Sequence, residues 1–234
     1  MNFDFSDDQK FLKSEARKFL DANCTTAKVR KVLDDEKVAY DAALWAAVAG
    51  QGWLGAAIPE EHGGLGLGHL ELCVIAEELG RVVAPIPFAS TVYFLAEAIM
   101  LAGSDTQKAA LLPKIAAGEV IGCVATSEGP GVLTAAALQT SVTGGKLTGT
   151  KLPVTDGDIA SHALVIAREN GQPGLFLVDL STGVTREPLQ TLDPTRDAAK
   201  LAFAGGRRRA SGRTGRRLRA AGTGHGPGGG TIVV

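Results

Sequence analysis

The fold is decided at Gly118-Glu119-Val120-Ile121-Gly122-Cys123-Val124-Ala125-Thr126, because the spacing of the apolar residues changes within this stretch. Before it, apolar residues recur at the three- and four-residue spacing of an amphipathic helix. After it, short runs rich in β-branched residues alternate with glycine-containing turns, as strands do. Helices followed by strands predict an α+β protein and argue against the alternating order of a doubly wound sheet.

Five helices are predicted before this stretch. Ser6 and Gln9 have the spacing of a capping box, and Ser104 with Gln107 repeats it. Pro85 prevents the third predicted helix from continuing far beyond Arg81. The first predicted helix starts at Ser6. The other four cover about Tyr40–Gly50, His69–Arg81, Ser90–Leu101 and Ser104–Ala117.

Seven short strands are predicted after it, separated by turns such as Asn170-Gly171. Strands of this length and spacing favour a small barrel or sandwich. We therefore expect a helical domain over residues 1–118 and a β-barrel domain over residues 119–204. The predicted strands are Val120–Thr126, Ala136–Thr143, Lys146–Val154, His162–Arg168, Leu175–Leu180, Val184–Leu189 and Lys200–Ala204.

The remainder, residues 205–234, has a different composition. It holds seven arginines, ten of the thirty glycines and no acidic residue. Since the chain has 24 basic and 25 acidic residues, 17 basic residues remain against 25 acidic ones in the body, a net charge of −8. A segment without apolar periodicity cannot offset the entropy of ordering it, so we expect a disordered tail. Its composition is also typical of GC-rich DNA translated out of frame, which predicts a frameshift near codon 205.

Bulk properties favour a soluble cytoplasmic protein. No apolar run reaches the roughly 18 to 20 residues that cross a bilayer, and the acidic start does not resemble a signal peptide. The three cysteines lie about fifty residues apart without a CxxC pair, which argues against a disulfide framework or a zinc site.

Motif chemistry alone identifies no active site. The glycine-rich run over residues 63–68 lacks a preceding strand and the GxGxxG spacing, so a turn between helices is favoured over a phosphate loop. The four histidines are scattered, and no metal site is predicted. Glu77 and Glu78 are adjacent on a helix, so their side chains diverge; we expect one to be solvated and the other packed.

Several motifs nevertheless occur in the order found in one enzyme family. They are Phe5-Ser6-Asp7-Asp8-Gln9, Ile58-Pro59-Glu60-Glu61-His62-Gly63-Gly64-Leu65-Gly66, Glu77-Glu78-Leu79-Gly80-Arg81 and Leu112-Pro113-Lys114-Ile115 with Gly118-Glu119. The second is similar to a "PEEYGGxG" loop, and the last to a "KxxxLPxLxxGE" passage. Together they resemble the acyl-CoA dehydrogenases.

This resemblance implies an oxidoreductase of lipid metabolism: a flavoprotein that uses FAD in the α,β-dehydrogenation of an acyl-CoA substrate. Ser127-Glu128-Gly129-Pro130-Gly131-Val132-Leu133-Thr134 stands where the family reads "TEPGAGSD". The segment Lys151-Leu152-Pro153-Val154-Thr155-Asp156-Gly157 stands where it reads "KxWITNG", with Pro153 for the tryptophan. By resemblance, Thr155 lies beside flavin N5. The flavin ring is lined by Val124, Thr126, Ser127 and Val154.

The resemblance leaves three functions open. The family's catalytic glutamate lies in a C-terminal helical domain, where this chain has its Arg/Gly-rich tail, so no catalytic residue is assigned. We therefore expect a truncated dehydrogenase that is inactive alone, or a non-catalytic subunit of a heteromeric acyl-CoA dehydrogenase. The expected partners are the acyl-CoA substrate and, in a homo- or hetero-oligomer, another acyl-CoA dehydrogenase subunit. In either case the family implies an electron-transfer flavoprotein as partner. The less favoured third function is nucleic-acid binding by the basic tail.

Overall fold

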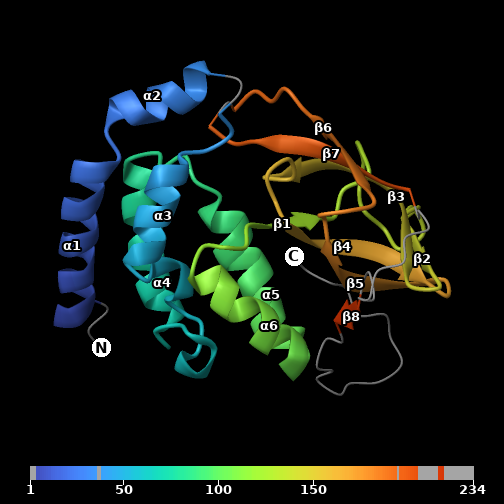
Figure 1. Ribbon diagram of the computed structural model, residues 1–234, viewed down its shortest axis with the longest axis horizontal. Coiled ribbons are helices and arrows are strands. Elements are labelled where there is room, and N and C mark those ends of the chain that lie inside the picture. The colour runs from blue at the N-terminus through green and yellow to red at the C-terminus, as the bar shows by residue number, and fades with distance from the viewer. Residues whose placement is uncertain (1–3, 36–37, 194, 205–215, 219–234) are drawn as a thin grey trace.

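The computed structural model describes residues 4–35, 38–193, 195–204 and 216–218. Its first part is helical, and Figure 1 shows the helices gathered on one side of a curled sheet. The α-helices are α1 (Asp7–Asn23), α2 (Thr26–Asp34), α3 (Ala42–Gly50), α4 (His69–Arg81), α5 (Glu97–Ala102) and α6 (Asp105–Ala116). Two 3₁₀-helices, η1 (Trp53–Gly55) and η2 (Glu60–His62), and the π-helix η3 (Ala89–Ala96) complete this part.

The local helix signals are confirmed. At α1, Gln9 N–H donates to Ser6 Oγ at 3.2 Å, and Ser6 N–H donates to Gln9 Oε1 at 2.9 Å. Ser104 and Gln107 form the same capping box at α6. The helix predicted over residues 90–101 differs, because its first part is the π-helix η3 and only its second part is α5. α2 was not predicted, although Val29, Val32 and Leu33 have the spacing of a helix face.

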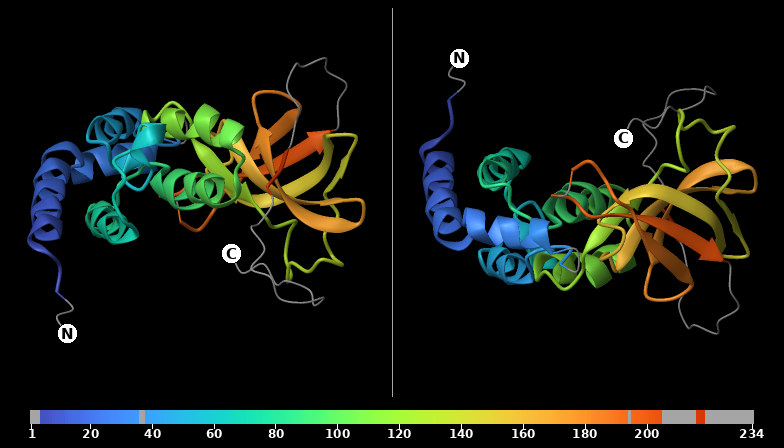
Figure 2. Two further views of the ribbon diagram at one scale, coloured as in Figure 1. Left: turned by 90° about the horizontal axis from the view of Figure 1, so that it is seen from below. Right: turned by 90° about the horizontal axis from the view of Figure 1, so that it is seen from above.

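The second part is a curled mixed sheet, a half-barrel (Figure 2). Its strand order is β6-β7-β3-β2-β4-β5-β8, and β1 pairs with β4 in parallel. The predicted strand over residues 136–143 is wrong for its first half, which forms a turn at Thr134–Ala137. The strands are β1 (Gly122–Ala125), β2 (Ser141–Thr143), β3 (Lys146–Thr155), β4 (His162–Glu169), β5 (Gln172–Asp179), β6 (Val184–Pro188), β7 (Ala198–Ala204) and β8 (Arg216–Leu218).

The strand β8 lies within residues 205–234, for which no helix or strand was predicted. The backbone of Arg216–Leu218 pairs with β5 in antiparallel fashion. The other tail residues, 205–215 and 219–234, lie outside the described residues. The expected disorder, the frameshift and nucleic-acid binding by the tail therefore stay predictions.

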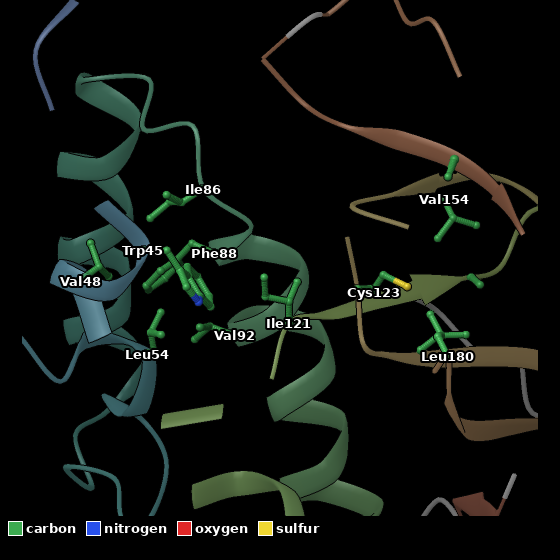
Figure 3. Close-up of a cluster of buried hydrophobic side chains, with 14 of the residues drawn as sticks. Trp45, Val48, Leu54, Ile86, Phe88, Val92, Ile121, Cys123, Val154 and Leu180 are labelled. Carbon is green, nitrogen blue, oxygen red and sulfur yellow. The ribbon is translucent and has the colours of Figure 1, made fainter. Parts of the chain in front are cut away.

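One hydrophobic core runs from the helices into the sheet (Figure 3). Trp45 lies at the helical end, Phe88 and Ile121 lie in the middle, and Cys123 and Val154 lie at the sheet end. The contact is closest where η3 rests on β1, because a Cβ added at Gly122 would lie 2.7 Å from Leu95 Cβ. Thr91 Oγ1 also accepts a hydrogen bond from Gly122 N–H at 3.0 Å. This close packing places η3 against the strand that carries the predicted flavin residues.

Glu77 and Glu78 behave as their adjacent helical positions predict. The Glu77 side chain is exposed and pairs with Lys13, whereas Glu78 is fully buried. Arg17 and Arg81 donate to the Glu78 carboxylate at 2.7 and 2.8 Å. The bond from Arg17, aided by Arg81, lowers the Glu78 pKa against the effect of burial. The ion pair between Arg17 and Glu78 joins α1 to α4, so its role is structural.

Among the described residues, no helix is long and apolar enough to span a membrane.

Candidate functional site

A cavity of about 300 Å³ lies where η3 meets the sheet. Its lining comes from η3, from β1 and the residue after it, from the end of β3, and from the loop before β7. Its size is at the lower end of the range for small-molecule sites in proteins. The lining residues are Ala89, Ser90, Phe94, Val124, Thr126, Thr155, Asp156 and Arg196.

The alternation of side chains along the strands explains which predicted residues meet there. On β1, Cys123 and Ala125 are fully buried, so Val124 and then Thr126 face the opposite side, toward the cavity. On β3, Val154 is fully buried and Thr155 is exposed in the cavity.

The cavity thus brings together three of the five predicted flavin residues. Val124, Thr126 and Thr155 line it, whereas Val154 packs beneath it in the core. Ser127 follows β1 outside the lining, and its hydroxyl donates to the Gly129 carbonyl at 3.1 Å. The role of these residues at a flavin stays a prediction.

Asp156 is the buried acid of the cavity, with only 4% of its surface exposed. Its carboxylate hydrogen-bonds Ser90 Oγ, which also lies 3.2 Å from the Pro87 carbonyl. Its backbone N–H donates to the Asp197 carbonyl at 2.9 Å, and its φ of 56° is one that aspartate tolerates better than most residues. Burial raises the Asp156 pKa, against the opposing effects of the Ser90 hydrogen bond and the Arg196 charge. The Ser90–Asp156 contact therefore joins η3 to the end of β3 at the lining of the cavity.

Replacing Ser90 by alanine is expected to lower the free energy of unfolding by about 1–3 kcal/mol, because a buried carboxyl oxygen loses its partner. Urea unfolding followed by circular dichroism measures this loss. The control is Ser14→Ala on exposed α1, which is expected to change stability by less than about 0.5 kcal/mol. Equal effects of the two substitutions would show that the Ser90–Asp156 contact contributes nothing.

Comparison with known proteins identifies the class. The family model described as "Acyl-CoA dehydrogenase, N-terminal domain" matches residues 6–119. Mitochondrial isovaleryl-CoA dehydrogenase from Solanum tuberosum is 30% identical over 190 residues, which are 77% of this chain and 46% of that protein. The chain belongs to the acyl-CoA dehydrogenase family. It spans about half the length of the relatives it matches.

Solved structures agree with this assignment of the acyl-CoA dehydrogenase fold. The ChsE4-ChsE5 complex from Mycobacterium tuberculosis is 28% identical with a TM-score of 0.79, and the match covers 94% of this chain and 59% of that one. A glutaryl-CoA dehydrogenase from Mycobacterium smegmatis, in complex with FADH2, has a TM-score of 0.78 at 22% identity. That match covers 93% of this chain and 56% of the other, and it shows the shared fold.

The acyl-CoA dehydrogenase segments at residues 127–134 and 151–157 are joined by a buried ion pair. Lys151 is fully buried, and its ammonium group donates to the Thr126 carbonyl at 3.0 Å and to Glu128 Oε1 at 2.9 Å. The Glu128 carboxylate also accepts from the backbone N–H groups of Gln139 and Thr140, at 2.6 and 2.8 Å. Glu128 therefore ties the loop after β1 to the segment just before β2 and, through Lys151, to β3.

The pKa values of Glu128 and Lys151 are both lowered, but for different reasons. Burial alone would raise the Glu128 pKa, but the hydrogen bonds from Thr140, Gln139 and Lys151 outweigh it and lower that pKa to about 2. Burial lowers the Lys151 pKa, and the neighbouring Glu128 opposes this shift. Glu128 is therefore ionised at neutral pH.

Five lining residues of the cavity were not predicted: Ala89, Ser90, Phe94, Asp156 and Arg196. Asp156 was quoted within the family segment at residues 151–157 and given no role, although its place beside Thr155 was a usable signal. Ser90 and Arg196 are far from β1 in sequence, and only the packing of η3 and of the loop before β7 brings them together. Among the described residues, no group of three His, Cys, Asp or Glu side chains is arranged to hold a metal ion.

Proposed function

We propose that this chain forms one wall of a flavin site, and that the complete protein catalyses the α,β-dehydrogenation of an acyl-CoA thioester. The observation that carries the proposal is the meeting of Val124, Thr126 and Thr155 in one cavity. The family relationship supports the reaction class. No described residue is assigned as the base that removes the α-proton.

The cavity suits a flavin ring. Val124, Ala89 and Phe94 supply apolar contact, and Thr126 and Thr155 supply hydroxyl groups that can donate or accept. Most small-molecule sites combine such an apolar lining with a few polar groups that orient the ligand. FAD, when bound, supplies hydride acceptance. The chain's own residues hold the ring, orient it through hydroxyl groups and exclude water from its face.

Replacing Thr155 by alanine is expected to weaken FAD binding about fivefold, the equivalent of one net hydrogen bond. Quenching of flavin fluorescence on titration with the 234-residue chain measures the dissociation constant. Thr148→Ala is the matched control, because Thr148 is an exposed threonine of the same strand outside the cavity. Lack of any FAD affinity in the wild-type chain would contradict the proposed function, and equal loss in both variants would contradict the role of Thr155.

The similarity to the ChsE4-ChsE5 complex supports a second candidate, a subunit of a heteromeric acyl-CoA dehydrogenase. The partner subunit would then supply the catalytic base. Co-expression of the tagged chain with an intact dehydrogenase subunit from the same source tests this, and failure to co-purify would contradict it. An electron-transfer flavoprotein as electron acceptor and a cytoplasmic location stay parts of the proposal.

A further inference from the structure

Asp156 and Arg196 form a polar corner in a cavity whose other walls are apolar or carry hydroxyl groups. Asp156 approaches from the end of β3, and Arg196 approaches from the loop before β7. The two lie close enough for the Arg196 charge to stabilise the Asp156 carboxylate. The corner thus places a hydrogen-bond acceptor beside a hydrogen-bond donor.

The acceptor is one oxygen of a nearly buried carboxyl group. Oδ2 of Asp156 is held by Ser90, which fixes the orientation of the group. Within the described part of the chain, no residue hydrogen-bonds Oδ1, and this atom is not among the buried polar atoms sealed from solvent. Oδ1 is therefore open to the cavity that Asp156 lines. If the carboxyl is protonated on Oδ2, Oδ1 is still an acceptor, so its role is the same in both protonation states.

The donor is the guanidinium group of Arg196. Its Nη1 donates to the Ile86 carbonyl at 3.1 Å, which anchors the side chain against the segment before η3. A guanidinium group has five N–H donors, so others can face a ligand. Arg196 is exposed, and it lines the cavity.

An acceptor beside a donor matches an imide edge, in which an N–H group is flanked by a carbonyl. Asp156 Oδ1 would accept from the N–H, and Arg196 would donate to the carbonyl. We propose that Asp156 and Arg196 recognise the imide edge of the flavin ring, its N3–H and an adjacent carbonyl. This inference rests on the proposed function, which supplies the flavin. It adds the two residues that orient the ring and a requirement for an unsubstituted N3–H.

Riboflavin and 3-methylriboflavin test the proposal, because the second lacks only the N3–H. Fluorescence titrations with the full 234-residue chain are expected to show about fivefold tighter binding of riboflavin, as for one net hydrogen bond. In Asp156→Ala this preference is expected to disappear, whereas Asp156→Asn, which keeps an oxygen acceptor, is expected to retain it. Arg196→Met is expected to weaken both ligands alike, because both keep the carbonyl.

Two further variants serve as a control and as a replacement for Asp156→Ala. Asp158→Asn is the matched control, since Asp158 is a nearby acid that does not line the cavity. This variant is expected to prefer riboflavin over 3-methylriboflavin as strongly as the wild type does. If Asp156→Ala does not fold at its positive φ, Asp156→Gly replaces it, because glycine adopts this conformation freely.

Each outcome decides a different statement. Equal binding of the two flavins by the wild-type chain would overturn recognition of the imide edge and leave the flavin site intact. A preference that persists in Asp156→Ala or Asp156→Gly would overturn the role of Asp156. No binding of either flavin would instead contradict the proposed function itself.

Discussion

Replacing Glu128 by glutamine is expected to lower the free energy of unfolding by about 3–5 kcal/mol, as for other buried ion pairs that lose one partner. The N–H groups of Gln139 and Thr140 bond different oxygens of the carboxylate, so the single oxygen of glutamine keeps one of these two hydrogen bonds. The substitution leaves the fully buried Lys151 ammonium without a counter-charge. The uncompensated charge, rather than the lost hydrogen bonds, is the main cost.

A double-mutant cycle separates this cause from a simple loss of packing. Lys151→Met removes the buried charge and fills its volume with apolar atoms, so we expect a smaller loss than for Glu128→Gln. The double variant is expected to be at least about 1 kcal/mol more stable than the sum of the single losses predicts. Urea unfolding measures all four proteins, and additive losses would contradict the coupling of Glu128 to Lys151.

The same carboxylate predicts part of the acid sensitivity. The folded-state Glu128 pKa of about 2 lies below the ordinary value of 4.5, so its contribution is complete above about pH 4.5. It is lost progressively as the pH falls from there toward about 2. The stability difference between the wild type and Glu128→Gln is therefore expected to shrink over this range. A difference that stays constant would show that Glu128 does not titrate with a lowered pKa.

Replacing Gly64 by alanine is expected to destabilise the chain by several kcal/mol, on the order of the largest single-residue effects. A Cβ at Gly64 would lie within 2.5 Å of the carbonyl carbon and the Cβ of Ile58. These atoms belong to backbone or to a fully buried residue, so they cannot move aside cheaply. The loop is held there by hydrogen bonds from Leu65 N–H to the Gly55 carbonyl and from Gly66 N–H to the Ile58 carbonyl, each 2.9 Å.

The matched control for this substitution is Gly80→Ala. Gly80 lies in α4, and a Cβ there would meet no atom within 4 Å. Alanine is favoured over glycine inside a helix by roughly 0.5–1 kcal/mol, so this variant is expected to be at least as stable as the wild type. Thermal unfolding by circular dichroism compares the two. Similar stability of the two variants would contradict the close packing of Gly64 on Ile58.

Local chemistry explains what could be predicted along the chain. The capping boxes at Ser6 and Ser104 need only four neighbouring residues, and both are present. The turn at Asn170-Gly171 was predicted, and the positive φ angles of both residues suit the hairpin that it forms between β4 and β5. The π-helical form of η3 was not predicted, because π-helices are rare and the spacing of apolar residues does not reveal them.

In the candidate site, too, some residues could be predicted from the sequence and others could not. Val124, Thr126 and Thr155 were proposed from family segments, and strand alternation then explains why Val124 and Thr155 face the cavity while Val154 does not. Ser90 lies 66 positions from Asp156, and no local pattern links them. Their contact exists because Gly122 lets η3 pack directly on β1.

The sequence by itself determined the order of helices and strands, the change of period at residues 118–126 and the family, since these depend on neighbouring residues and motifs. Tertiary structure alone decided which side chains form the cavity and which stay in the core. It also decided that Lys151 is buried against Glu128 and that Asp156 and Arg196 line the same cavity. Such contacts depend on how distant segments pack, and the free energy of burying a charge is set by the partners that packing supplies.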